Sequence, residues 1–144
     1  MKLIKYQAKV ELDEDGVTVT FPDLPGCITQ GNTLEEALAH AIEALDLYLE
    51  EANNPKWEIP IPKERKGRNY HWVSPGPEIS VPLTLKIMRL TEKVSQSALA
   101  LKMGIKVQQV QKLEYVKKSN PTAKKMIELM DELGYELSFT KKEK

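Results

Sequence analysis

The side chains best suited to reading another molecule lie in residues 95–114, SQSALALKMGIKVQQVQKLE. Ser95 can cap a short helix and Gly104 can end it in the left-handed conformation, before a second helix over about residues 107–116. Two helices joined by such a turn form a helix-turn-helix, whose second helix enters the major groove of DNA. Glutamine can pair with adenine and lysine can donate to guanine. We therefore predict a DNA-reading surface made by Lys106, Gln108, Gln109, Gln111 and Lys112.

This stretch resembles the Cro/repressor class in its glutamine after the cap, its Leu-Ala pair, its turn glycine and its closing Leu-Glu. The resemblance covers roughly residues 84–135. It implies that Val107, Gln108 and Lys112 read bases, with Val107 touching a thymine methyl group. It also implies phosphate contacts from Gln96, Lys117 and Lys118. The alternative is that glutamines on an exposed helix serve only solubility.

Groups that could perform catalysis are few. A two-metal nuclease needs several converging carboxylates, whereas the acids of residues 13–15 share one turn and Asp23 stands apart. His40 and His71 are isolated, and Cys27 has no evident partner for nucleophilic chemistry. We predict no catalytic residue, no metal ligand and no cofactor, so the chain is not expected to be an enzyme.

The charge of the chain is divided unevenly. Its 144 residues have a formal net charge of +0, but residues 1–80 hold 8 Lys and Arg against 14 Asp and Glu, and residues 81–144 hold 13 against 7. An acidic half favours a basic protein partner, and a basic half favours nucleic acid. We predict two domains, 1–80 and 81–144, with a proline-rich linker at about 55–80. The absence of a long apolar run, of a signal peptide and of paired cysteines predicts a cytoplasmic chain without a membrane partner.

Hydrophobic periodicity predicts an α+β fold. Residues 4–12 and 17–21 alternate as two strands of a hairpin, a short third strand follows at 27–30, and Thr33 caps a helix that ends near residue 54. The apolar stripe of that helix includes Leu34 and Ile42. It covers one face of a three- to four-stranded sheet.

The second half begins after the linker. Of two candidates for a last strand, 70–73 and 78–81, we favour 78–81. Pro82 is expected at the first position of a helix. This helix is the first of four short helices, and alternation over residues 135–139 predicts a short C-terminal strand.

The phrase FPDLPGCITQGNTLEEA at residues 21–37 closely resembles the N-terminal domain of HicB antitoxins. The resemblance implies a partial RNase H-like fold that binds HicA, a small basic ribonuclease toxin. An acidic domain covering a basic RNA-binding surface would block it. The expected toxin contacts are the loop after the second strand, the acidic helix and two aromatic residues: Pro22, Asp23, Leu24, Pro25, Glu35, Glu43, Tyr70 and Trp72.

Three functions remain open at this point. The leading one is an antitoxin that neutralises a HicA-like toxin and represses its own operon, bound to operator double-stranded DNA as a homodimer or higher even oligomer. The strand at 135–139 would pair across that dimer. The second is a repressor whose N-terminal domain binds a small molecule. The third is an active RNase H-like enzyme, which the scattered carboxylates disfavour.

Overall fold

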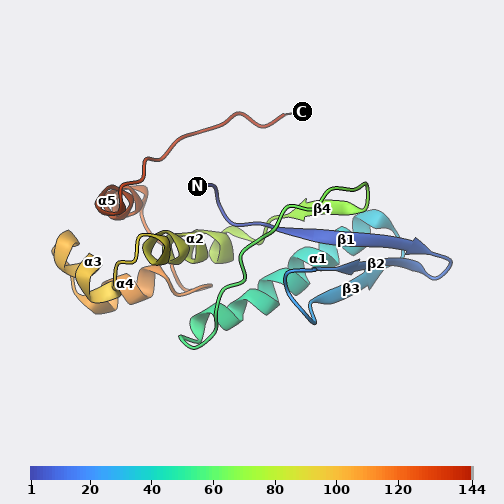
Figure 1. The fold of residues 1–144 in the computed structure, drawn as a ribbon, viewed down its shortest axis with the longest axis horizontal. Helices are drawn as coiled ribbons and strands as arrows, with labels where there is room; N and C mark the ends of the chain where they lie inside the picture. Colours follow the sequence, from blue (N-terminus) through green and yellow to red (C-terminus); the bar gives the residue numbers. More distant parts are fainter. Residues whose placement is uncertain (144) are drawn as a thin grey trace.

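The computed structural model describes residues 1–143, so the last residue of the expected second domain lies outside the described part. A four-stranded antiparallel sheet with the order β3-β2-β1-β4 lies at one end, and four helices lie at the other (Figure 1). The sheet consists of β1 (Tyr6–Asp13), β2 (Gly16–Thr20), β3 (Ile28–Gly31) and β4 (Tyr70–Val73). The helices are α1 (Leu34–Leu49) with a 3-10 turn η1 (Glu50–Asn53), α2 (Pro77–Thr91), α3 (Gln96–Met103), α4 (Val107–Leu113) and α5 (Ala123–Leu133). The α+β class is confirmed.

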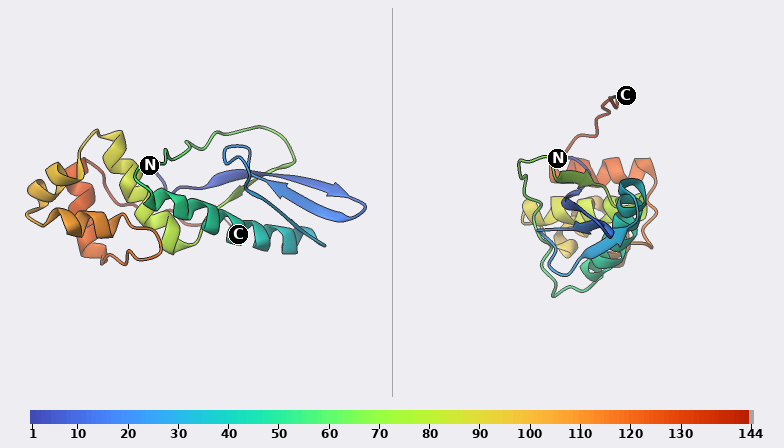
Figure 2. Two further views of the ribbon diagram at one scale, coloured as in Figure 1. Left: turned by 90° about the horizontal axis from the view of Figure 1, so that it is seen from below. Right: turned by 90° about the vertical axis from the view of Figure 1, so that its right-hand side faces the viewer.

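The hairpin and its covering helix follow the predicted pattern. Asp13 pairs with Gly16 at the turn, and the alternating Tyr6, Ala8 and Val10 are buried. Thr33 caps α1 by accepting a hydrogen bond from the Glu36 N–H at 3.1 Å. The helix packs on one face of the sheet, and the linker crosses the other face (Figure 2).

The apolar stripe of α1 is narrower than predicted. Its buried residues are Ala37, Ala41, Leu45 and Leu49. Leu34 and Ile42, expected to face the sheet, are 42% and 41% exposed. The buried positions form a stripe with a spacing of four residues, and the other two side chains fall outside it.

The last strand was wrongly assigned. Residues 70–73 form β4, which pairs antiparallel with β1, whereas residues 78–81 belong to α2. Gly76 is the N-cap of α2 and Pro77 occupies the first turn, so Pro82 lies inside the helix and not at its start. Strand β4 depends on the free edge of β1, which is more than 50 residues away in sequence.

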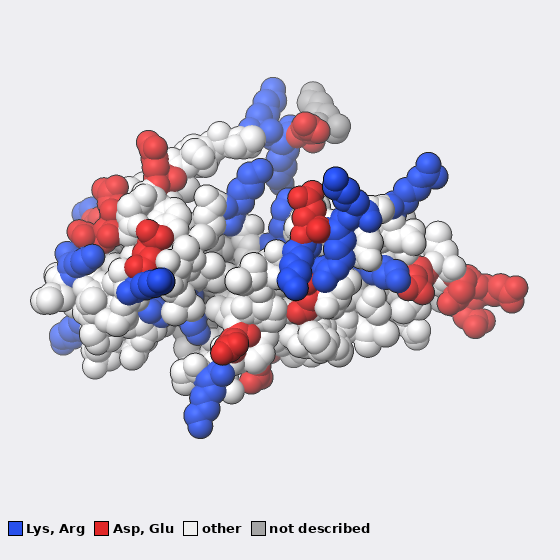
Figure 3. Space-filling view, in the orientation of Figure 1, with Lys and Arg blue, Asp and Glu red and all other residues white. Residues whose placement is uncertain are grey.

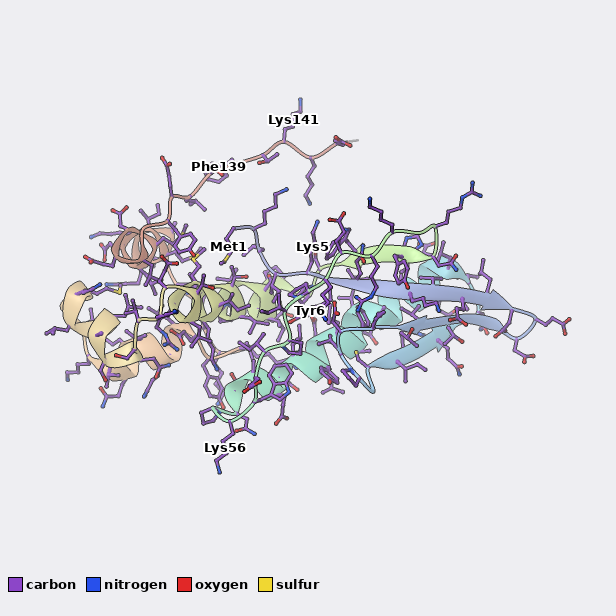
Figure 4. The ribbon with its side chains drawn as sticks, viewed as in Figure 1. Met1, Lys5, Tyr6, Lys56, Phe139 and Lys141 are labelled. Carbon is purple, nitrogen blue, oxygen red and sulfur yellow. The ribbon has the colours of Figure 1, made fainter. Side chains whose placement is uncertain are left out.

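The predicted C-terminal strand is absent from the described chain. Residues 135–143 have no regular secondary structure, and Phe139 is 93% exposed. The segment runs away from the body of the molecule, with Phe139 and Lys141 far from any strand (Figure 4). The Tyr135 N–H bonds to the Met130 carbonyl at the end of α5, and none of the four described strands pairs with this segment.

Helix α2 contributes to two hydrophobic clusters. Ile79 and Leu83 pack with the sheet and α1, whereas Leu85 and Met88 pack with α3, α4 and α5. The expected domain boundary at residue 80 therefore lies within a helix that both clusters share. The division at that residue stays a prediction.

A joint connects the end of α4 to the sheet unit. Val116 is 1% exposed and belongs to the first cluster. The side chain of Asn53 accepts from the Val116 N–H at 2.9 Å and donates to its carbonyl at 3.4 Å. The Lys117 N–H donates to the Glu78 carbonyl at 2.8 Å. These contacts anchor the chain immediately after the helix predicted to read DNA.

None of the described helices is both long and apolar enough to cross a membrane.

Gly31 permits the close approach of β3 to α1. A Cβ atom there would lie 2.6 Å from the backbone nitrogen of Ala37 and 2.9 Å from its Cα. Because backbone atoms cannot rotate away, we expect Gly31→Ala to lower the free energy of unfolding by about 1–3 kcal/mol. Denaturant unfolding measures this, with Gln30→Ala as a control at an exposed neighbour. Equal stability of the two variants would contradict the close approach.

Candidate functional site

Helices α3 and α4 form the predicted helix-turn-helix. The Ser95 Oγ accepts from the Ala98 N–H at 3.0 Å, and Gly104 ends α3 in the left-handed conformation with a φ of 68°. Leu99, Ala100 and Val110 are buried between the helices. The outer face of α4 is thus held in place by packing on its inner face.

Three of the predicted reading residues share one exposed face of α4. Gln108, Gln111 and Lys112 are exposed, and their spacing of three and four residues places them side by side. Val107 is half-buried against the second cluster. Gln109 is used within the chain, because its Oε1 accepts from the Lys106 N–H at 2.9 Å and caps the helix.

A buried ion pair, which sequence reasoning missed, connects α2 to the end of α4. Arg89 donates to both carboxylate oxygens of Glu114, at 2.6 and 2.9 Å, and to the Val94 carbonyl at 2.8 Å. Gln96 also donates its amide to Glu114, at 3.2 Å. The expected phosphate-contacting residue is therefore fixed at the start of α3. The closing Leu-Glu was the available signal for Glu114, but nothing local pointed to Arg89.

The two lysines after α4 have different environments. The Lys117 Nζ lies 2.7 Å from Glu50, and this hydrogen bond raises the pKa of Lys117. Its backbone has a φ of 71°, which is uncommon for a residue with a side chain. Lys117 therefore belongs to the joint. Lys118 is exposed, with its Nζ 5.4 Å from the Tyr115 ring.

The loop after β2 is largely structural. Leu24 is completely buried in the first cluster, so it cannot contact a partner as expected. Asp23 accepts from Arg65 and from the Lys63 N–H, each at 2.9 Å, and ties the linker to the loop. Burial alone would raise the pKa of Asp23, but these hydrogen bonds and the positive charge of Arg65 keep it below its usual value. Pro22 and Pro25 remain exposed.

The outward face of α1 combines acidic and apolar side chains. Glu35 and Glu43 are exposed, as are Ile42 (41%) and Leu47 (68%). Pro25 lies beside this helix, because its carbonyl accepts from the Tyr48 hydroxyl at 2.9 Å. Sequence reasoning missed the two apolar residues of this face, having placed Ile42 in the core.

The two aromatic residues lie elsewhere. Tyr70 pairs with Lys9 and Trp72 pairs with Gln7 on the face of the sheet opposite to α1. The Lys5 Nζ lies 5.1 Å from the Trp72 ring. The structure therefore does not bring these residues together with the acidic helix.

Comparisons with known proteins agree with both halves of the chain. Residues 6–71 match the family described as HicB_like antitoxin of bacterial toxin-antitoxin system, and residues 85–139 match a helix-turn-helix family. Antitoxin HicB 2 of Photorhabdus laumondii is 36% identical over 116 residues, which cover 78% of this chain and 78% of that protein. The chain belongs to the HicB antitoxin family. Antitoxin HicB 1 of the same organism is 34% identical over 120 residues, covering 78% of this chain and 72% of that protein.

As a member of a non-catalytic antitoxin family, the chain is not an enzyme, as predicted. The carboxylates, the thiol and the histidine that were considered for catalysis lie apart from one another in the structure. The acids of residues 13–15 are exposed in the hairpin turn. Burial raises the pKa of Cys27 to about 11, which keeps the thiol protonated at neutral pH. The His40 Nδ1 lies 2.8 Å from the Gln30 carbonyl.

The Arg89–Glu114 pair is expected to control the stability of the helix-turn-helix. Its side chains are 8% and 3% exposed, so Glu114→Ala leaves a buried guanidinium without its counterion. We expect a loss of about 3–5 kcal/mol in the free energy of unfolding, measured by denaturant titration. The double variant Arg89→Met with Glu114→Leu should recover much of this loss, because it removes both charges. A double variant as unstable as the single one would contradict this account.

Proposed function

We propose that this HicB protein neutralises a HicA-like ribonuclease toxin with the outward face of α1 and represses its own operon through α4. The main support is that one chain combines an exposed acidic and apolar face on α1 with a helix-turn-helix whose glutamine and lysine side chains on α4 are exposed. Both proposed partners would be met in the cytoplasm.

The outward face of α1 suits a basic protein. Ile42 and Leu47 provide apolar anchors, and Glu35 and Glu43 provide the surrounding charge. Complementary charge speeds encounter and suppresses wrong partners. Pro22 and Pro25 would extend this surface, whereas Asp23 and Leu24 support it from within the loop. Tyr70 and Trp72 are left out, because they lie on the opposite side of the sheet.

Reversing one charge on α1 tests the toxin surface. We expect Glu43→Lys to weaken binding of the purified toxin at least about tenfold, because a like charge would face a basic partner. Calorimetry and inhibition of RNA cleavage measure the effect. The matched control is Glu132→Lys, an identical charge change at an exposed site on α5. Equal weakening by both variants would indicate a general charge effect and would exclude α1 as the specific surface.

Operator binding requires two copies of the helix-turn-helix. One unit covers one half-site, and two half-sites lie about 34–36 Å apart along the duplex. Leu137 and Phe139 of the segment 135–139 are exposed, which supports pairing of this segment with the same segment of a second copy. A monomer in size-exclusion chromatography at high concentration would contradict the dimer.

Gln108 and Lys118 are expected to affect DNA binding differently. Gln108→Ala should lower operator affinity by about 1–3 kcal/mol and relax base preference at one position. Lys118→Ala should weaken all duplexes alike and reduce the salt slope by about 1. Fluorescence anisotropy with operator and random duplexes measures both. If the wild type binds the two duplexes equally, specific repression is wrong.

The small-molecule alternative gains no support from the cavities. A groove of about 960 Å³ lies between the N-terminal segment, residues 55–62 and α2, and it is open and lined mainly by apolar side chains. Sites for small molecules bury most of the ligand's surface, whereas this groove is open to solvent.

A further inference from the structure

The face of the sheet opposite to α1 is basic. Lys5 and Lys9 project on this side of β1, as shown by the contact of Lys5 with Trp72 and by the pairing of Lys9 with Tyr70. The linker crosses the same face. The backbone N–H of Arg65, a linker residue, donates to the side chain of Gln7, and the Arg65 carbonyl accepts from it. Lysine and arginine side chains gather over this linker and the strands beneath it (Figure 3).

The linker supplies charges that are free to bind. Lys63, Lys66 and Arg68 are exposed, whereas Arg65 is paired with Asp23. Glu64 and Glu11 are the acidic neighbours, and Glu11 is paired with Lys9 at 3.2 Å. The two sides of the sheet therefore carry opposite charge: an acidic helix on one side and a basic strand-and-linker surface on the other. A basic toxin that docks on α1 would be repelled here.

An exposed indole lies within this basic surface. Trp72 is 41% exposed on the edge strand β4, with the Lys5 ammonium 5.1 Å from its ring. Aromatic side chains surrounded by lysine and arginine on a sheet surface suit single-stranded nucleic acid, whose unstacked bases can stack on the ring. Duplex DNA offers its phosphates but no free base for such a contact.

The surface continues toward the helix-turn-helix. Lys5 and Trp72 also line the 960 Å³ groove, which extends past Trp57 and Leu90 to Gln96 at the start of α3. An extended strand of several nucleotides has room along this path. Apolar walls accommodate bases, and the exposed Lys2 at the groove can meet a phosphate. Lys86 also lines the groove but is engaged, because its ammonium donates to the Ala52 carbonyl at 2.8 Å, and Glu58 is the acidic residue of the lining.

We propose that the sheet face opposite to α1, together with the linker at 63–68, binds a single-stranded nucleic acid. Phosphates contact Lys63, Lys66 and Arg68, and one base stacks on Trp72. This site is separate from the operator surface on α4 and from the toxin surface on α1. The proposal can therefore be tested independently of both.

The test uses the full chain and two fluorescent probes of about 12 nucleotides, oligouridylate RNA and oligothymidylate DNA. We expect anisotropy to show binding that weakens steeply between about 50 and 200 mM salt. Trp72→Ala should lower probe affinity about tenfold, and Trp72→Phe should retain most of it. The double variant Lys66→Glu with Arg68→Glu should weaken binding at least as much and flatten the salt dependence, without altering any packed side chain.

Several outcomes decide the proposal. Loss of probe binding in the Trp72 and linker variants, with operator binding unchanged, supports it, and comparison of the two probes then tells RNA from DNA. No binding by the wild type overturns it. Binding that Lys112→Ala on α4 abolishes, but that the linker variant leaves intact, also overturns it, because the probe would then occupy the operator surface. Loss of toxin binding in Trp72→Ala with unchanged probe binding would assign the face to a protein and overturn it as well.

Discussion

The arrangement of the molecule depends on one missing hydrogen-bond donor. Pro82 lies inside α2, where a residue with an N–H would bond to the carbonyl of Glu78 four positions earlier. That carbonyl instead accepts from the Lys117 N–H at 2.8 Å. The proline therefore leaves a backbone acceptor that a distant segment of the chain satisfies. A residue that weakens a helix locally thereby creates the attachment point for the segment that follows α4.

The other contacts of the joint fix the position of this segment against the end of α1. Val116 enters the core beneath α1, Asn53 bonds both backbone groups of Val116, and Glu50 holds the ammonium of Lys117. Both Glu50 and Asn53 lie in the 3-10 turn that continues α1. The same helix therefore carries the proposed toxin surface along its length and the anchor of the DNA-binding unit at its end. A toxin on α1 would occupy a defined position relative to α4, without any change of conformation.

Local signals predicted the elements whose causes are local. Thr33, Ser95 and Gly104 each act within one turn of a helix, and the alternation of β1 and β2 reflects burial of one face of the sheet. Residues 70–73 were a candidate strand that we did not favour, because β4 depends on pairing with β1 and four residues carry too little periodicity to reveal this. The start of α2 was misplaced because both Pro77 and Pro82 satisfy the rule for a first position. The internal proline is accommodated because a distant donor, the Lys117 N–H, satisfies the Glu78 carbonyl that Pro82 leaves without its helical partner.

For the functional surfaces, the sequence indicated which side chains have suitable chemistry, but it did not indicate which of them are free to bind a partner. Gln109, Lys117 and Asp23 have the chemistry expected of binding residues, yet each polar group is already engaged: in a helix cap, in the joint and in the attachment of the linker. The charge of the N-terminal half shows the same difficulty. Its net acidity hides a basic face, because the linker folds its lysines and arginines onto the side of the sheet that α1 leaves open. Composition averages over both faces, whereas a partner meets only one of them, so the two sides of a single four-stranded sheet can attract partners of opposite charge.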